Sequence, residues 1–218
     1  MAYLTYIIDN YHNLPEYLGF IHGHETGWHQ AVPMTLLLQA FNFSMVDEQG
    51  YVGLRCQAGR GCQNDDYLVT NYNGTNKFKK VGNLFKGFHE YVFRPSDAWY
   101  QPVPTYIKAT VGAQFVVTRA AVLARPLEFW KRVRRPLTRD LSELKGWWRF
   151  DETPSSWMMG MMFEKSWPYL FGLDAQECMD EDVCWATVFQ DRLLCDNKDG
   201  LFVNGKYTAP ANCTLREP

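Results

Sequence analysis

Apolar side chains recur with helical spacing along much of the chain. Their positions predict helices over residues 3–11 and 32–43. A third helix is predicted to start at Pro126, because the fixed φ of proline suits the first turn of a helix, and to run towards Pro136. These helices alternate with shorter apolar runs, which are typical of buried strands.

Two of the short runs predict strands that bear on function. Residues 17–21 end at His22-Gly23-His24, and residues 112–119 are rich in β-branched side chains. Helices interleaved with short strands predict an α/β domain with a mostly parallel central sheet flanked by helices. Ligands bind at the carboxyl ends of strands in such sheets, so His22 and His24 should lie at the rim of a cleft.

A fourth helix is predicted in the second half of the chain, with Thr153 as its N-cap and Gly172 at its end. Glu164 interrupts the apolar and aromatic stretch inside it. If this carboxylate faces a cleft, burial should raise its pKa, which suits a general acid or base. The alternative is a structural ion pair with Arg119 or Arg149.

The length of 218 residues suffices for one domain with a sizeable core, and a single α/β domain over residues 1–218 is predicted. Residues 57–81 are rich in Gly, Asn and Lys and should form a long mobile loop. An irregular tail is expected from about residue 195, in which Asn204-Gly205 favours a hairpin.

Composition narrows the possible classes of function. Aromatic residues make up 16% of the chain, which favours a ligand-binding protein over a pure scaffold. The net charge of -2 gives no global field that attracts nucleic acid, and DNA is not an expected partner. No apolar run approaches the roughly 20 residues of a membrane span. The start of the chain has no basic leader, so a cytoplasmic protein without a membrane contact is predicted.

The six cysteines all fall in predicted loops or in the tail. An even number of loop cysteines suits disulfides in an oxidising compartment. Because no leader is evident, we favour reduced thiols instead. No C-x-x-C pair occurs and the histidines lie far from the cysteines, so neither a zinc site nor any other metal site is expected.

Three of the five histidines fall within eight residues, at His22, His24 and His29, beside Trp28. Histidine acts as an acid, a base or a ligand near neutral pH, and His22 and His24 share a face of an extended strand. We favour a place in the functional cleft over a metal site. The alternative is a set of hydrogen-bonding loop residues that hold Trp28.

Two charged runs have plain interpretations. Asp180-Glu181-Asp182 contains a D-x-D, as metal-dependent glycosyltransferases have, but a solvated loop is the favoured interpretation. Basic side chains follow Pro126 with helical spacing and form a charged face over an apolar one. They suit contacts with RNA phosphates, although such runs are usually only solvated surface. They are Lys131, Arg132, Arg135 and Arg139.

Several short segments match, in order, a pattern found in one protein family. They are YLTYIIDNY at 3–11, LP at 14–15, FIHGH at 20–24, WH at 28–29, LRC at 54–56, GC at 61–62, GAQF at 112–115, TR at 118–119, FE at 163–164, W at 167 and FG at 171–172. With these segments the chain resembles a domain-of-unknown-function family of filamentous fungi, which looks like the source of the arginine-containing cyclodipeptide synthases. The acidic D-D-x-x-E signature of those synthases is absent here.

The resemblance implies an enzyme that joins arginine and a second amino acid, taken from charged tRNAs, into a diketopiperazine without a cofactor. It implies catalytic acids and bases among Glu164, His22, Asp151 and Glu152. Substrate-binding side chains would then include His24, Trp28, His29, Gln114, Arg119 and Trp167, with the basic helix face docking tRNA. The order of elements is also similar to small glycosyltransferases with a nucleotide-sugar fold, and a non-catalytic accessory protein is a third possibility.

Overall fold

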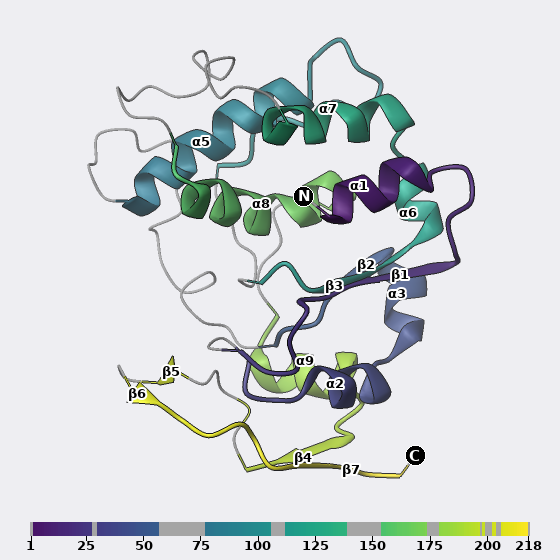
Figure 1. Ribbon diagram of the computed structural model, residues 1–218. Helices are drawn as coiled ribbons and strands as arrows, with labels where there is room; N and C mark the ends of the chain where they lie inside the picture. The colour runs from purple at the N-terminus through teal and green to yellow at the C-terminus, as the bar shows by residue number, and fades with distance from the viewer. Residues whose placement is uncertain are drawn as a thin grey trace.

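The computed structural model describes residues 2–27, 30–56, 77–105, 112–138, 154–173, 179–196, 198, 202–203 and 206–217. Across these residues a small sheet lies in the middle of the molecule, with a group of helices on one side (Figure 1). A mixed group of helices and paired strands lies on the other side. The molecule therefore has two cores that share one sheet.

Three short strands form the central sheet in the order β1–β3–β2: β1 (Tyr17–Phe20), β3 (Phe115–Thr118) and β2 (Tyr51–Gly53). β3 pairs antiparallel with both neighbours, with Leu18 opposite Val117 and Val52 opposite Val116. The prediction of a mostly parallel central sheet, and with it the glycosyltransferase-like arrangement, is wrong. A short apolar run is compatible with either direction, because the direction is set by a partner far away in the sequence.

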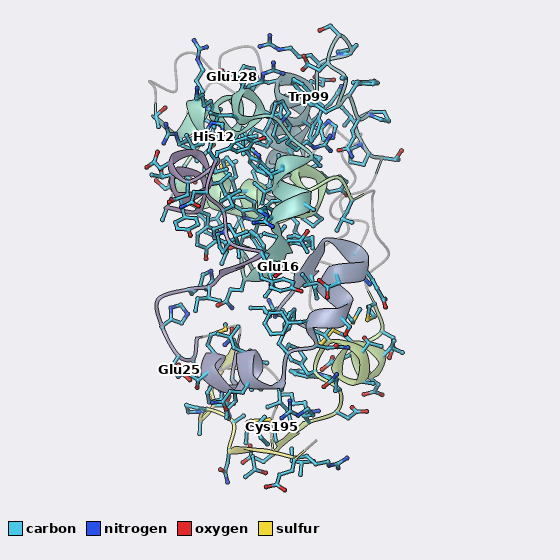
Figure 2. All side chains as sticks on the ribbon, turned by 90° about the vertical axis from the view of Figure 1, so that its right-hand side faces the viewer. His12, Glu16, Glu25, Trp99, Glu128 and Cys195 are labelled. Carbon is cyan, nitrogen blue, oxygen red and sulfur yellow. A yellow bond between two sulfur atoms is a disulfide. The ribbon has the colours of Figure 1, made fainter. Side chains whose placement is uncertain are left out.

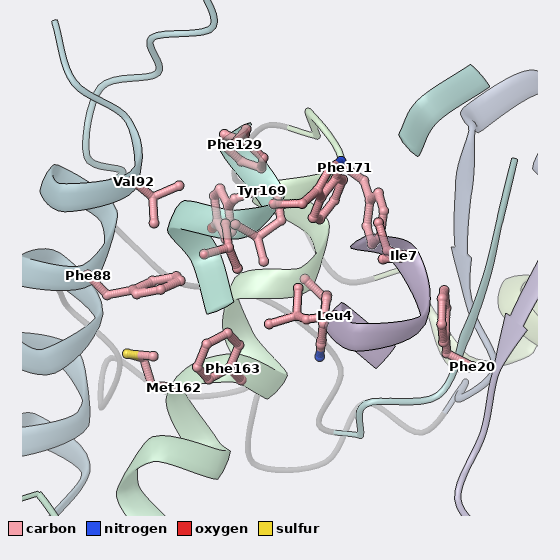
Figure 3. Packing of buried hydrophobic residues seen from close by; sticks show 14 of the residues in the cluster. Leu4, Ile7, Phe20, Phe88, Val92, Phe129, Met162, Phe163, Tyr169 and Phe171 are labelled. Carbon is pink, nitrogen blue, oxygen red and sulfur yellow. The ribbon is translucent and has the colours of Figure 1, made fainter. Parts of the chain in front are cut away.

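Five helices cover one face of the sheet: α1 (Ala2–Asp9), α5 (Lys77–Val92), α6 (Arg119–Leu123), α7 (Leu127–Thr138) and α8 (Ser156–Leu170). α8 packs against α5, and α1 packs against α7. Leu4, Phe88 and Phe163 lie in the hydrophobic cluster between them, and Phe20 reaches it from the sheet (Figure 3). This helical layer holds the larger core of the molecule.

The other face carries the remaining elements: α2 (Met34–Ala40), α3 (Phe43–Gln49), α9 (Glu181–Val188), the pair β4 (Leu193–Cys195) with β7 (Cys213–Leu215), and the pair β5 (Phe202–Val203) with β6 (Lys206–Tyr207). Side chains fill both layers, with Trp99 and Glu128 among the helices and Glu25 and Cys195 at the opposite end (Figure 2). In β3, Phe115 and Val117 join the helical core and Val116 joins the second core. Because successive side chains of a strand point to opposite faces, β3 contributes side chains to both cores.

Most of the predicted elements are present, with shifted ends. The predicted helix over 3–11 is α1, the strand over 17–21 is β1, and the helix after Pro126 is α7. The helix over 32–43 is confirmed as the shorter α2, and the tail hairpin as β5 with β6. Residues 57–76 lie outside the described part of the chain.

Two loop predictions are wrong where the chain is described. The last five residues of the predicted mobile loop, 77–81, form the start of helix α5 instead. The acidic run, predicted as a solvated loop, begins α9: Asp180 is its N-cap and accepts hydrogen bonds from the amides of Asp182 (3.0 Å) and Val183 (3.3 Å). Carboxylates near a helix N-terminus are stabilised by the helix dipole, which explains the run without a metal.

The ends of α8 are well defined. Its N-cap is Ser155, which accepts a hydrogen bond from the Met158 amide (3.3 Å), and the predicted cap Thr153 lies outside the described residues. Gly172 follows the helix with φ +89°, and the Leu173 amide donates to the Pro168 carbonyl (3.0 Å). The predicted stop at Gly172 is confirmed, because this left-handed position favours glycine.

Two disulfides join cysteines of the described residues. Cys56–Cys184 ties the chain after β2 to α9, and Cys195–Cys213 links β4 to β7. The prediction of reduced thiols is wrong for these four cysteines, because the fold brings distant loops together. Cys62 and Cys178 lie outside the described residues. Both disulfides belong to the second core or its edge.

His89 of α5 is expected to make the fold sensitive to acid. Its side chain is 2% exposed among the rings of Phe85, Phe93 and Tyr169, and within the described residues neither ring nitrogen has a hydrogen-bond partner. Burial lowers its pKa to about 4 from 6.5. Because the unfolded chain binds the proton first, stability falls as pH drops from 6.5 towards 4. The loss is about 3 kcal/mol, from two and a half pKa units.

Urea denaturation at pH 7 and at pH 4 measures this loss. His89→Phe keeps a ring among rings and removes the titrating group, so its stability should change less between the two pH values. An equal acid loss in both proteins would show that His89 is not responsible.

Candidate functional site

A pocket of about 640 Å³ opens beside α8 in the helical layer. One face of α8 forms its longest wall, with residues spaced at three and four positions: Ser156, Met159, Gly160, Phe163, Glu164 and Trp167. Tyr3 of α1 and Leu137 of α7 add further apolar surface. This size and lining suit a small organic ligand or part of a larger one.

The pocket brings together two of the predicted catalytic side chains. His22 reaches it two residues after the end of β1, and Glu164 reaches it from the middle of α8. Ala113, which precedes β3, also lines it. The carboxyl end of β1, the amino end of β3 and the middle of α8 therefore meet at a single pocket, although the sheet is antiparallel.

Glu164 sits in surroundings that favour its neutral form. Burial raises the pKa of its carboxyl group, and the positive charges of Lys165 and Arg55 oppose that rise without cancelling it. Lys165 is completely buried, and burial lowers the pKa of its ammonium group to about 8. The predicted alternative of an ion pair with Arg119 does not hold, and Arg149 lies outside the described residues.

Two buried polar atoms belong to residues that line the pocket, and one is a hydrogen-bond donor while the other is an acceptor. Within the described residues, Glu164 Oε2 and Trp167 Nε1 have no hydrogen-bond partner. The indole N–H can only donate, and an ionised carboxylate can only accept. Leaving such atoms unpaired is costly, and because both are covered in the structure, a ligand with one donor and one acceptor pairs with them only after the neighbouring side chains shift.

Buried amides hold the backbone at His22 in place. The His22 amide donates to Gln114 Oε1 (3.1 Å), Gln114 Nε2 donates to Gln30 Oε1, and Gln30 Nε2 donates to the Val32 carbonyl (3.0 Å). Gln114, predicted to bind substrate, is therefore a positioning residue. Its role follows from its burial, which leaves 3% of it exposed.

The imidazole of His22 is favoured in its neutral form. Burial lowers its pKa, and the nearby His24 lowers it further. The two rings lie 5.2 Å apart, and His24 is exposed outside the pocket lining. A neutral imidazole accepts a proton at neutral pH, so His22 and Glu164 offer two acid–base groups in one pocket.

Other predicted substrate and catalytic residues do not reach the pocket or are not described. Arg119 is exposed at the far end of β3, where its guanidinium donates to the Leu14 carbonyl (3.4 Å). Trp167 lines the pocket, and its predicted role in substrate binding stays a prediction. The remaining four lie outside the described residues: Trp28, His29, Asp151 and Glu152.

The predicted tRNA-binding side chains lie on α7 with differing environments. Lys131 pairs with Glu128 (2.6 Å), and Arg132 pairs with Asp97 and donates to the Val92 carbonyl (3.0 Å). Arg135 is exposed, and Arg139 lies outside the described residues. Arg132 therefore has a structural role, whereas Lys131 and Arg135 remain on the surface.

Sequence reasoning missed one pocket-lining residue and two charged residues that act on Glu164. Tyr3 lines the pocket, and burial raises the pKa of its hydroxyl to about 12. Arg55 acts on Glu164 through its charge from the chain after β2, and Lys165 adjoins Glu164 in sequence. Lys165 gave a visible signal, since it is a second charge inside an apolar helix. Within the described residues no group of three or more His, Cys, Asp or Glu side chains is placed to hold a metal ion.

The fold and the pocket define an α/β protein with two acid–base groups in one cavity. Over residues 1–187 the chain matches the family described as "Protein of unknown function (DUF3431)", and it belongs to that family. The predicted membership of a domain-of-unknown-function family is confirmed. No curated protein and no solved structure matches the chain. None of the helices in the described ranges combines the length and apolarity needed to cross a membrane.

Proposed function

We propose that the protein is an enzyme that transfers aminoacyl groups in the pocket beside α8, in the manner of the fungal arginine-containing cyclodipeptide synthases. The observation that carries the proposal is a pair of buried atoms, Glu164 Oε2 and Trp167 Nε1, that have no hydrogen-bond partner among the residues the structure describes. An aminoacyl group presents amine donors and a carbonyl acceptor a few atoms apart, so it complements both atoms. Aromatic walls from Tyr3 and Phe163 suit the cationic or apolar part of such a group.

The chemistry needs no cofactor. The amine of one aminoacyl group attacks the ester carbonyl of another, so that a C–N bond forms and the C–O bond to the tRNA ribose breaks. Glu164 takes the amine proton and returns a proton to the departing ribose oxygen. A second, intramolecular aminolysis closes the diketopiperazine and releases the other tRNA. A raised pKa brings Glu164 nearer to neutral pH, where proton transfer in both directions is effective.

The position of α7 supports charged tRNAs as the partners. α7 contributes Leu137 to the pocket, and Lys131 and Arg135 are exposed on the same helix. A tRNA acceptor end bound along these cations would therefore lie on a helix that lines the pocket. The proposal assigns the protein to the cytoplasm, where charged tRNAs are present.

Expression of the full chain in a bacterial host tests the proposal. Mass spectrometry of the medium should detect a cyclic dipeptide that contains arginine and is absent from cells with an empty vector. In a cell-free reaction with purified protein, treatment with RNase should abolish the product, because the aminoacyl donors are tRNAs. A product that survives RNase, or no cyclic dipeptide in either system, would contradict the proposal.

The two disulfides favour a second candidate. Disulfides persist in oxidising compartments, where charged tRNAs are absent. A sugar hydroxyl both donates and accepts, so a glycosyl group also complements Glu164 and Trp167. The second candidate is a glycosyltransferase of an oxidising compartment; because the sheet is antiparallel, the order of elements no longer supports it, and it rests on the disulfides and these two atoms alone. Binding of a sugar nucleotide, measured by calorimetry with UDP-glucose, together with no cyclic dipeptide, would favour it.

A further inference from the structure

The face of α8 that lines the pocket contains one position without a side chain. Gly160 lies inside this helix, which runs from Ser156 to Leu170. Glycine in a helix interior costs about 1 kcal/mol relative to alanine, because its backbone loses more freedom on folding. A glycine at this position therefore calls for a reason.

Packing does not supply that reason. A Cβ atom placed on Gly160 meets no other atom within 4 Å. Two other glycines have a structural reason. Gly50 and Gly172 have left-handed φ angles of +75° and +89°, and a Cβ at Gly50 would come within 3.3 Å of Ala121. Gly160 has ordinary helical backbone and open space, so the fold itself would accept alanine.

The open space lies in the pocket, next to the catalytic candidate. Gly160 precedes Glu164 by four residues, so the two occupy the same face one turn apart, and both line the pocket. Side chains on a helix lean towards its N-terminus, so the Glu164 side chain extends over the turn that contains Gly160. A side chain at position 160 would therefore project into the pocket on the side of Glu164, although a Cβ there stays more than 4 Å from the Glu164 side chain. Met159 and Phe163 line the pocket from the same face of the helix.

We propose that Gly160 is a specificity-determining residue: the missing side chain admits the bulky group next to the amine that Glu164 binds. This inference rests on the proposed function, since it takes the pocket ligand to be an aminoacyl group. The apolar neighbours Met159 and Phe163 select an apolar stem or ring for the gap. Alanine at position 160 stabilises the fold and narrows the range of ligands.

Amino-acid amides serve as probes, because they keep the amine and the carbonyl of an aminoacyl ester and resist hydrolysis. Calorimetric titrations of the full chain with glycine amide, phenylalanine amide and arginine amide compare wild type with Gly160→Ala. The variant should melt at a higher temperature and bind the two larger amides about tenfold more weakly, whereas glycine amide should bind almost unchanged. Gly160→Leu, which fills the gap, should weaken binding of all three.

Gly19→Ala is the matched control. Gly19 is an exposed glycine of β1 outside the pocket, and a Cβ there also meets nothing within 4 Å. This variant should leave all three affinities unchanged. Equal binding of the larger amides to wild type and Gly160→Ala would overturn the role of Gly160 and leave the proposed function standing. If wild type binds none of the amides, the proposed function fails and the inference falls with it.

Discussion

Loss of the Cys56–Cys184 disulfide is expected to lower the free energy of unfolding by about 5 kcal/mol, the largest effect of any change considered for this fold. The bond joins residues 128 positions apart, and closing so long a loop removes much conformational freedom from the unfolded chain. Both cysteines are buried in the second core, so the variant Cys56→Ala with Cys184→Ala keeps the site apolar. Urea denaturation of the two proteins measures the difference.

The second disulfide provides an internal comparison. Cys195 and Cys213 are only 18 positions apart, so their replacement by alanine should cost about 3 kcal/mol. A larger loss from this pair than from Cys56–Cys184 would contradict the loop-length argument. A reductant that breaks both bonds, as verified by thiol counting, should also lower the free energy of unfolding. An unchanged free energy of unfolding would contradict the argument.

Replacement of Glu164 by glutamine is expected to reduce product formation at least 100-fold, the usual contribution of a positioned acid or base. The fold should remain intact, because glutamine is similar in size and its neutral amide removes a charge whose burial is unfavourable. In the wild type, the acid limb of the rate profile should have an apparent pKa above the ordinary value for glutamate. The cell-free assay, run across pH, measures both effects.

Glu48→Gln is a suitable control for Glu164→Gln. Glu48 is an exposed carboxylate of α3 outside the pocket lining, so its replacement should leave the rate unchanged. Full activity in Glu164→Gln would remove this residue from the mechanism. A low melting temperature in that variant would instead indicate that its activity loss is structural.

The elements with local signals were predictable, and the pairing of the strands was not. Gly172 ends α8 because glycine alone readily takes the left-handed angles needed there, and Pro126 precedes α7 as expected. The direction of β1 depends on Val117, which lies opposite Leu18 from a distant part of the chain. No property of residues 17–21 contains that information, so the parallel sheet was a wrong inference.

Helices α5 and α9 were missed because polar residues masked their apolar pattern. In α5, Val81, Leu84, Phe85 and Phe88 are all buried and follow helical spacing, but asparagine, glycine and lysine around them suggested a loop. In α9 the acidic run was the signal of a helix start and not of a loop. In both segments the polar composition indicated a loop, although the spacing of the apolar residues or the position of the acidic residues was that of a helix.

The candidate site was predictable as a set of separate residues. Histidine after a strand and a carboxylate inside an apolar helix each indicated a functional position, and His22 and Glu164 line the same pocket. Their roles stay predictions. Arg55 was out of reach of sequence reasoning, because its effect on Glu164 depends on how the chain after β2 approaches α8.

The order of the strands has a consequence for folding kinetics. β3 is the central strand, yet it follows β1 and β2 along the chain, and it pairs with both. During synthesis β1 and β2 therefore leave the ribosome before their common partner. They stay without this partner until Thr118, at the end of β3, has been synthesised. Such non-local pairing slows folding and exposes strand edges to other chains meanwhile. Refolding should accordingly be slow and sensitive to protein concentration.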